Sequence, residues 1–86
     1  MVFERMELTQ MEKAISYIDD VFGYSPMNYS EKEDILLFDN PIVIAESPQL
    51  SFLGVGIVKE DNEIKMYMKM FDSDNDEFYY TRGIEI

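Results

Sequence analysis

The stretch EIKMYMKMF, residues 63–71, alternates two kinds of side chain more strictly than any other part of the chain. Successive side chains of an extended strand point to opposite sides. One side carries only aliphatic residues, namely Ile64, Met66, Met68 and Met70. The other side carries Lys65, Tyr67, Lys69 and Phe71. A strand with one wholly apolar side needs neighbouring strands and a covering element, so the three methionines are expected to lie in the core. The alternative is that they form an adaptable apolar surface for a partner, because methionine repacks easily.

Residues 8–23, LTQMEKAISYIDDVFG, have the period of a helix that could cover this side. Thr9 followed by Glu12 has the pattern of a capping box at the helix start. Gly23 fits the position just after the last helical turn. The expected apolar stripe consists of Met11, Ala14, Ile15, Ile18, Val21 and Phe22.

The remaining chain is read as a polar loop, residues 24–34, followed by short β-type runs between turn-forming residues. The runs cover residues 34–38, 41–47, 50–59, 63–71 and 77–86, and the first two are either separate strands or one bent strand. Strands that follow each other through short turns favour an antiparallel meander. The sequence therefore predicts a single α+β domain, residues 1–86, with an N-terminal helix packed on a four- or five-stranded antiparallel meander sheet.

Charge limits the partners of such a domain. The chain has 86 residues, of which 18 are acidic and 7 basic, with no histidine and a net charge of −11. Direct binding to nucleic acid or to an anionic membrane is disfavoured, because both need Lys and Arg. A basic protein partner is favoured. Nearly half of the residues (47%) are apolar, which is enough for a packed core and argues against disorder.

The missing residue types also limit the chemistry. The chain has neither cysteine nor histidine, so it lacks disulfides and the usual nucleophile–base pairs of hydrolases. We expect no enzyme activity and no cofactor. The absence of cysteine, of a membrane-spanning run and of a signal peptide leads to the expectation of a cytoplasmic protein.

The acidic stretch DSDNDE, residues 72–77, allows three interpretations. An EF-hand calcium loop would need glycine at the sixth position and glutamate at the twelfth, where this chain has Glu77 and Gly83. No metal site is therefore expected. An ordinary hairpin turn suits the Asp, Asn and Ser residues. Alternatively, Asp72, Asp74 and Asp76 in an extended segment would stand about 6.6 Å apart on one side and imitate a row of phosphates.

The segment VIAESPQLSFLGVG, residues 43–56, introduces a resemblance. Glu46 and Ser47 resemble the first two residues of the Glu-Ser-Ile stretch of small acidic inhibitors of uracil-DNA glycosylase, although Pro48 replaces the isoleucine. The later segments GIVKEDNEIKMYMKM and FYYTRG are similar in order to elements of a divergent branch of that family. The resemblance covers about half of the chain and implies a protein that mimics DNA. In a meander, the turns at 46–50 and 72–77 would lie at the same end of the sheet.

These observations predict a small inhibitor from a phage or mobile element that occludes a basic, DNA-binding host enzyme in the host cytoplasm. Uracil-DNA glycosylase, a restriction enzyme or a CRISPR effector are the expected kinds of target. The predicted contact residues are Glu46, Ser47, Asp72, Asp74, Asp76 and Glu77, followed by Glu60 and Asp61.

A different class of function stays open, that of an acidic interaction or subunit module whose charge only keeps it soluble. Its contacts would come from an aromatic face formed by Tyr67 and Phe71 with Tyr79 or Tyr80 opposite. Such a module would be a monomer, or a homodimer paired through the last strand.

Overall fold

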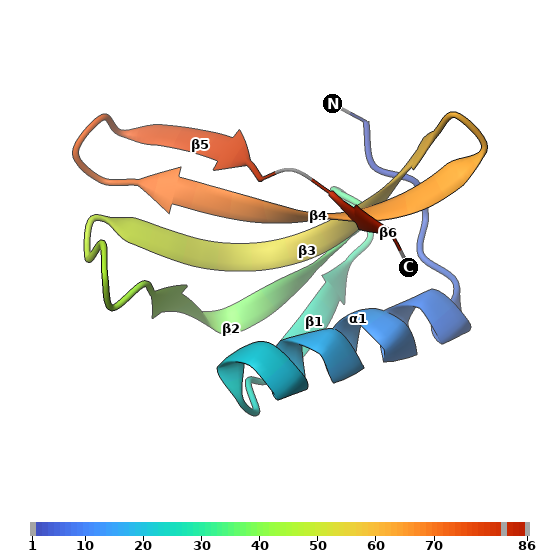
Figure 1. Ribbon diagram of the computed structural model, residues 1–86, viewed down its shortest axis with the longest axis horizontal. Helices are drawn as coiled ribbons and strands as arrows, with labels where there is room; N and C mark the ends of the chain where they lie inside the picture. Colours follow the sequence, from blue (N-terminus) through green and yellow to red (C-terminus); the bar gives the residue numbers. More distant parts are fainter. Residues whose placement is uncertain (1, 82, 86) are drawn as a thin grey trace.

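The computed structural model describes residues 2–81 and 83–85, which form one helix and a six-stranded antiparallel sheet (Figure 1). The elements are α1 (Leu8–Phe22), β1 (Met27–Ser30), β2 (Ile35–Val43), β3 (Leu50–Glu60), β4 (Glu63–Asp72), β5 (Glu77–Tyr80) and β6 (Ile84–Glu85). The strand order is β1-β2-β3-β4-β5, and β6 pairs with β4. The predicted α+β fold, a helix followed by an antiparallel meander, is confirmed.

Strand β1 lies within residues 24–34, where the sequence analysis expected only a loop, so that expectation was wrong. Met27 and Tyr29 pack against the core, while Asn28 is exposed. This is the alternation of a strand, but it extends over too few residues to stand out in the sequence.

Strand β2 is one irregular strand, as the bent-strand alternative proposed. Its pairing with β3 shifts register between Leu37 and Ile42, in the region of Asp39, Asn40 and Pro41. It ends at Val43, so the expected extension to residue 47 was wrong. Proline lacks the amide that a regular ladder needs, which accounts for an irregularity at this point.

The last predicted strand, residues 77–86, is divided into β5 and β6. Both pair with β4, β5 through residues 69–72 and β6 through Lys65 and Met66. Gly83 lies so close to β4 that a Cβ atom there would stand 2.7 Å from the Tyr67 ring. Positions 82 and 86 of the predicted strand lie outside the described residues.

The helix begins at Leu8, the first residue of the predicted stretch, but its N-cap lies two residues before the Thr9 that the capping-box pattern indicated. Its N-cap is Glu7, whose amide donates to Gln10 Oε1 at 2.8 Å, and Thr9 lies inside the first turn. The preceding segment is held in place because Met6 is buried and the Glu4 amide donates to the Ile57 carbonyl at 2.9 Å. Gly23 has a φ of 82° and stands at the helix end, as predicted.

The core lies between α1 and one face of the sheet. Met66 and Met70 are buried and Ile64 and Met68 pack against them, which confirms the core predicted from residues 63–71. From the helix, Ala14 and Ile18 are fully buried. The buried stripe of the helix is narrower than predicted, because Ile15, Val21 and Phe22 are exposed.

The opposite face of the sheet carries no helix, and we call it the uncovered face. The chain's first residues partly fill it, since Phe3 contacts Tyr80 edge to face with ring centroids 5.0 Å apart. Gly56 leaves the space for this contact, because a Cβ there would meet the Phe3 ring at 2.3 Å. Lys69 also lies on this face and donates to Glu33 in the β1–β2 turn at 2.9 Å.

Candidate functional site

The predicted contact residues divide between opposite ends of the sheet (Figure 1). The Asp72 end consists of the β2–β3 loop, residues 44–49, and the β4–β5 turn, residues 72–77. The Glu60 end consists of the β1–β2 turn, residues 31–34, and the β3–β4 turn, residues 60–63. Glu46, Ser47, Asp72, Asp74, Asp76 and Glu77 belong to the Asp72 end. Glu60 and Asp61 do not join them.

The stretch DSDND forms a hairpin turn, so the interpretation as an extended row of carboxylates was wrong. Asp72 Oδ1 accepts a bond from the Asp74 amide at 3.0 Å, and its Oδ2 accepts one from Asn75 Nδ2 at 2.8 Å. Asp76 has a φ of 52°, which turns the chain back into β5. Short polar side chains bond their own backbone in this way, and that local gain replaces the extended form.

The two segments of the Asp72 end are bonded to each other, as the meander predicted. Both the amide and the hydroxyl of Ser73 donate to the carbonyl of Gln49, at 2.9 and 3.1 Å. Leu50 lies directly opposite Asp72 in the β3–β4 ladder. The carboxylates of the turn are therefore carried on a support that includes the β2–β3 loop.

Glu46 and Ser47 lie in this loop and not at the end of a strand. The Ser47 amide donates to Ile44 at 3.1 Å, and its carbonyl accepts from Leu50 at 2.8 Å. These bonds fold the loop into a compact turn with the Glu46 side chain exposed.

The carboxylates of the Asp72 end form no ion pair among the described residues. No Lys or Arg occurs between residues 33 and 58 or between 70 and 81. The ion pairs of the described chain involve only Lys65 and Lys69, and both reach acids of the Glu60 end. The exposed carboxylates of this end are Glu46, Asp74, Asp76 and Glu77.

The Glu60 end is acidic too, but three of its acids, Glu33, Glu60 and Glu63, form ion pairs. Lys65 Nζ lies 3.8 Å from Glu60 and 4.0 Å from Glu63. The Tyr67 hydroxyl contacts both Glu60 oxygens, at 2.9 and 3.0 Å. Asp61 and Asn62 have φ values of 50° and 66°, which is the geometry of a tight two-residue hairpin turn. Glu60 therefore has a structural role beside Tyr67 and Lys65.

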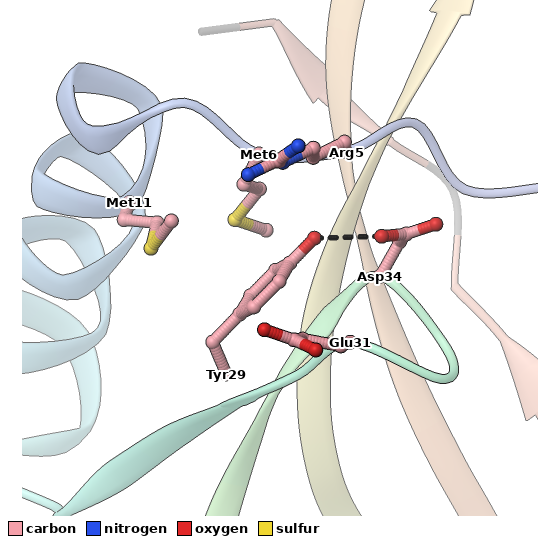
Figure 2. Close-up of a pocket in the computed structure, with 6 residues that line it drawn as sticks. All are labelled: Arg5, Met6, Met11, Tyr29, Glu31 and Asp34. Atoms are coloured by element: carbon pink, nitrogen blue, oxygen red, sulfur yellow. Dashed lines mark hydrogen bonds between the residues drawn. The ribbon is translucent and has the colours of Figure 1, made fainter.

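A hollow at the same end was not predicted from the sequence (Figure 2). It has a volume of about 350 Å³ and is lined by Arg5, Met6, Met11, Tyr29, Glu31 and Asp34. The Tyr29 hydroxyl donates to Asp34 Oδ1 at 2.8 Å. Burial, and then the bond to Asp34, raise the pKa of Tyr29 above its usual value of 10.0. The signal that could have located this hollow is the short alternation of β1, from which Tyr29 projects.

Aromatic residues lie beside the Asp72 end on the uncovered face. Phe71 and Phe78 are directly opposite each other, with ring centroids 4.8 Å apart. Lys69 Nζ stands 5.3 Å from the centre of the Phe78 ring. Tyr80 lies opposite Lys69 and Tyr79 opposite Met70, so Tyr80 belongs to the uncovered face and Tyr79 packs against the core. Of the two tyrosines that the sequence left open, Tyr80 therefore joins the aromatic face.

Within the described residues, no helix is long and apolar enough to cross a membrane. Comparisons of the chain with protein-family models, with curated proteins and with solved structures found no match.

Proposed function

We propose that this protein is an inhibitor that occludes a DNA-binding enzyme by presenting DNA-like negative charge. The observation that carries the proposal is the Asp72 end, where exposed carboxylates stand on a bonded support and form no ion pair among the described residues. Its contact residues are Asp74, Asp76, Glu77 and Glu46, with Ser47 and Asp72 holding the loops that carry them. The protein has no enzyme activity of its own in this proposal, and it acts in the cytoplasm of the host cell.

The mechanism follows from electrostatics. A DNA-binding enzyme holds phosphates with Lys and Arg side chains, and the counterions released on binding supply much of its affinity. Carboxylates fixed at the end of a rigid hairpin can occupy the same cations, because complementary charge speeds encounter and fixes orientation. The hairpin also blocks the DNA site by its bulk.

The test is competition with DNA. Duplex DNA immobilised on beads is loaded with the DNA-binding proteins of a bacterial lysate, and the purified protein is added at moderate ionic strength. We expect selective release of one or a few DNA-processing enzymes, identified by mass spectrometry. A purified uracil-DNA glycosylase is the first enzyme to assay by itself, because the Glu46–Ser47 resemblance indicates it.

Two matched variants decide whether the release depends on the Asp72 end. The Asp72-end variant carries Asp74→Asn, Asp76→Asn and Glu77→Gln. It keeps Asp72, whose side chain organises the turn. We expect this variant to lose most of the releasing activity.

The Glu60-end variant carries Glu31→Gln, Asp61→Asn and Glu63→Gln, which removes the same charge from the opposite end. We expect it to release enzymes as the natural protein does. Equal activity of both variants, or release of every bead-bound protein alike, would contradict the proposal. Either result would show that the overall negative charge of the protein releases the enzymes without specificity.

A further inference from the structure

Strand β5 is the last strand of the sheet order, and its backbone has an open side. The Thr81 amide donates to the Met68 carbonyl at 2.9 Å across the β4–β5 ladder. Bonded and non-bonded pairs alternate in an antiparallel ladder. Tyr79 therefore bonds inward to Met70, and the amide and carbonyl groups of Phe78 and Tyr80 point away from β4.

The side chains at this edge are exposed as well. Phe78 is 63% exposed and Tyr80 is 38% exposed, and both lie on the uncovered face. Natural sheets usually protect such edges with lysine or proline. Residues 72–81 contain neither, whereas Pro26 stands directly before β1 at the other edge.

The charges beside this edge favour one kind of occupant. Asp74, Asp76 and Glu77 adjoin one end of β5 and are exposed, and Glu85 of β6 lies farther along the same side of β4. The only cation next to β5 on β4, Lys69, is bonded to Glu33 and has a side chain only 14% exposed. A second copy of this chain would bring another net charge of −11 to this edge, and like charges repel.

We propose that β5 binds an extended, basic segment of the partner protein by strand addition. The added strand would bond to the outward backbone groups of Phe78 and Tyr80 and pack its apolar residues on their rings. Its Lys or Arg residues would pair with Glu77 and with the turn beyond it. The inference rests on the proposed function in so far as the partner is basic, and it names the element that the partner contacts.

The experiment uses two short synthetic peptides and the whole protein. The first peptide alternates lysine with valine and can form a strand. In the second, proline replaces valine, which keeps the charge but prevents pairing. Fluorescence anisotropy gives the affinity, and hydrogen exchange by NMR gives the protection of individual amides.

We expect the first peptide to bind about tenfold more tightly than the second, since one net backbone hydrogen bond corresponds to roughly this factor. The amides of Phe78 and Tyr80 should become protected on binding. The Tyr79 amide, already bonded to β4, should not change.

A pair of variants isolates the backbone donor. Phe78→Ala removes the ring and keeps the amide, whereas Phe78→Pro removes both. Because this amide points outward, proline leaves the bonds to β4 in place, and a thermal unfolding curve checks the fold. We expect Phe78→Pro to bind the first peptide several-fold more weakly than Phe78→Ala.

The remaining outcomes overturn the inference or the proposed function separately. Equal affinity for both peptides, absence of binding, or equal behaviour of the two Phe78 variants would rule out strand addition. The DNA-competition result would still stand in those cases. Protection of Phe78 and Tyr80 without peptide, together with a dimer in solution, would show that a second copy occupies the edge. Strand addition that the Asp72-end variant leaves unchanged would keep the edge site but contradict charge-led recognition.

Discussion

Two pairs of acidic residues lie directly opposite each other beside hairpin turns, and their surroundings differ. At the Glu60 end, Glu60 faces Glu63, and Lys65 and Tyr67 stand beside them. At the Asp72 end, Asp72 faces Glu77, and no described Lys or Arg forms an ion pair with either. Like charges opposite each other destabilise a sheet, so one end compensates this cost and the other does not.

The position of Lys69 sharpens the contrast. Lys69 lies close to Asp72 along β4, yet its ammonium group reaches Glu33 at the other end of the sheet. Among the described residues, the three acids that form ion pairs are Glu33, Glu60 and Glu63, and all belong to the Glu60 end. No acid of the β4–β5 turn or the β2–β3 loop forms one within this part of the chain. Counting charges along the chain does not separate the two sets, whereas their partners do.

The largest expected effect concerns Lys69. Lys69→Ala removes the bond to Glu33 and the packing of the buried stem, so unfolding should become easier by about 1.5 kcal/mol. Chemical denaturation measures this change. Lys13→Ala on the exposed side of α1 is the control and should change stability by less than about 0.5 kcal/mol. Equal effects of the two substitutions would show that Lys69 stabilises nothing specific.

The second prediction compares the effect on stability of replacing a glutamate by alanine at each end of the sheet. Glu60→Ala leaves the Tyr67 hydroxyl and Lys65 without this acceptor and should destabilise the protein by about 1 kcal/mol. Glu46→Ala, at the Asp72 end, removes a side chain with no described ion pair and should change stability by less than about 0.5 kcal/mol. Thermal unfolding compares them. A larger loss of stability for Glu46→Ala than for Glu60→Ala would show that Glu46, and not Glu60, is the acid with the structural role.

The third prediction concerns repulsion. The Asp72-end variant should be more stable than the natural protein by about 0.5 kcal/mol at low ionic strength, because uncompensated charges repel. The gain should shrink as salt screens the charges. The Glu60-end variant should gain less, since Glu63 gives up its contact with Lys65. Denaturation at two salt concentrations measures both gains in stability. A gain that does not change with salt concentration would argue against a Coulombic cause.

The smallest expected effect concerns the stability of the protein at alkaline pH. The pKa of Tyr29 is raised in the folded protein, so its protonated form is favoured by folding. This contribution is complete below the unfolded value near 10 and is lost as the pH rises through the folded value. Tyr29→Phe should therefore lose less stability than the natural protein as the pH rises above about 10. The exposed Tyr24 gives the control Tyr24→Phe, which should follow the natural protein.

Much of the fold could be predicted because it depends on long, regular patterns. The alternation of residues 63–71 and the period of residues 8–23 determine a strand, a helix and the faces they bury. The short or broken elements were missed for a physical reason. Met27–Ser30 is too short to show a period. The close approach of Gly83 to the Tyr67 ring, between β5 and β6, is a cross-strand contact that the sequence does not display.

The candidate site was only partly predictable. The sequence placed the 46–50 and 72–77 turns together, because a meander brings alternate turns to one end. It could not show that Glu60 is engaged by Tyr67 and Lys65, since that depends on cross-strand contacts. It also could not show which backbone groups of β5 point outward, because the ladder alternation is set by register.

The bond between Glu4 and Ile57 has a consequence for how the chain reaches its native state. The β3–β4 hairpin joins neighbouring segments through a tight turn and can form early, because its contacts are local. The segment around Glu4 precedes α1, but its partner Ile57 lies in β3. Until β3 exists, Phe3 and Met6 have no site to occupy. The segment before α1 is therefore among the last parts of the chain to reach its native position.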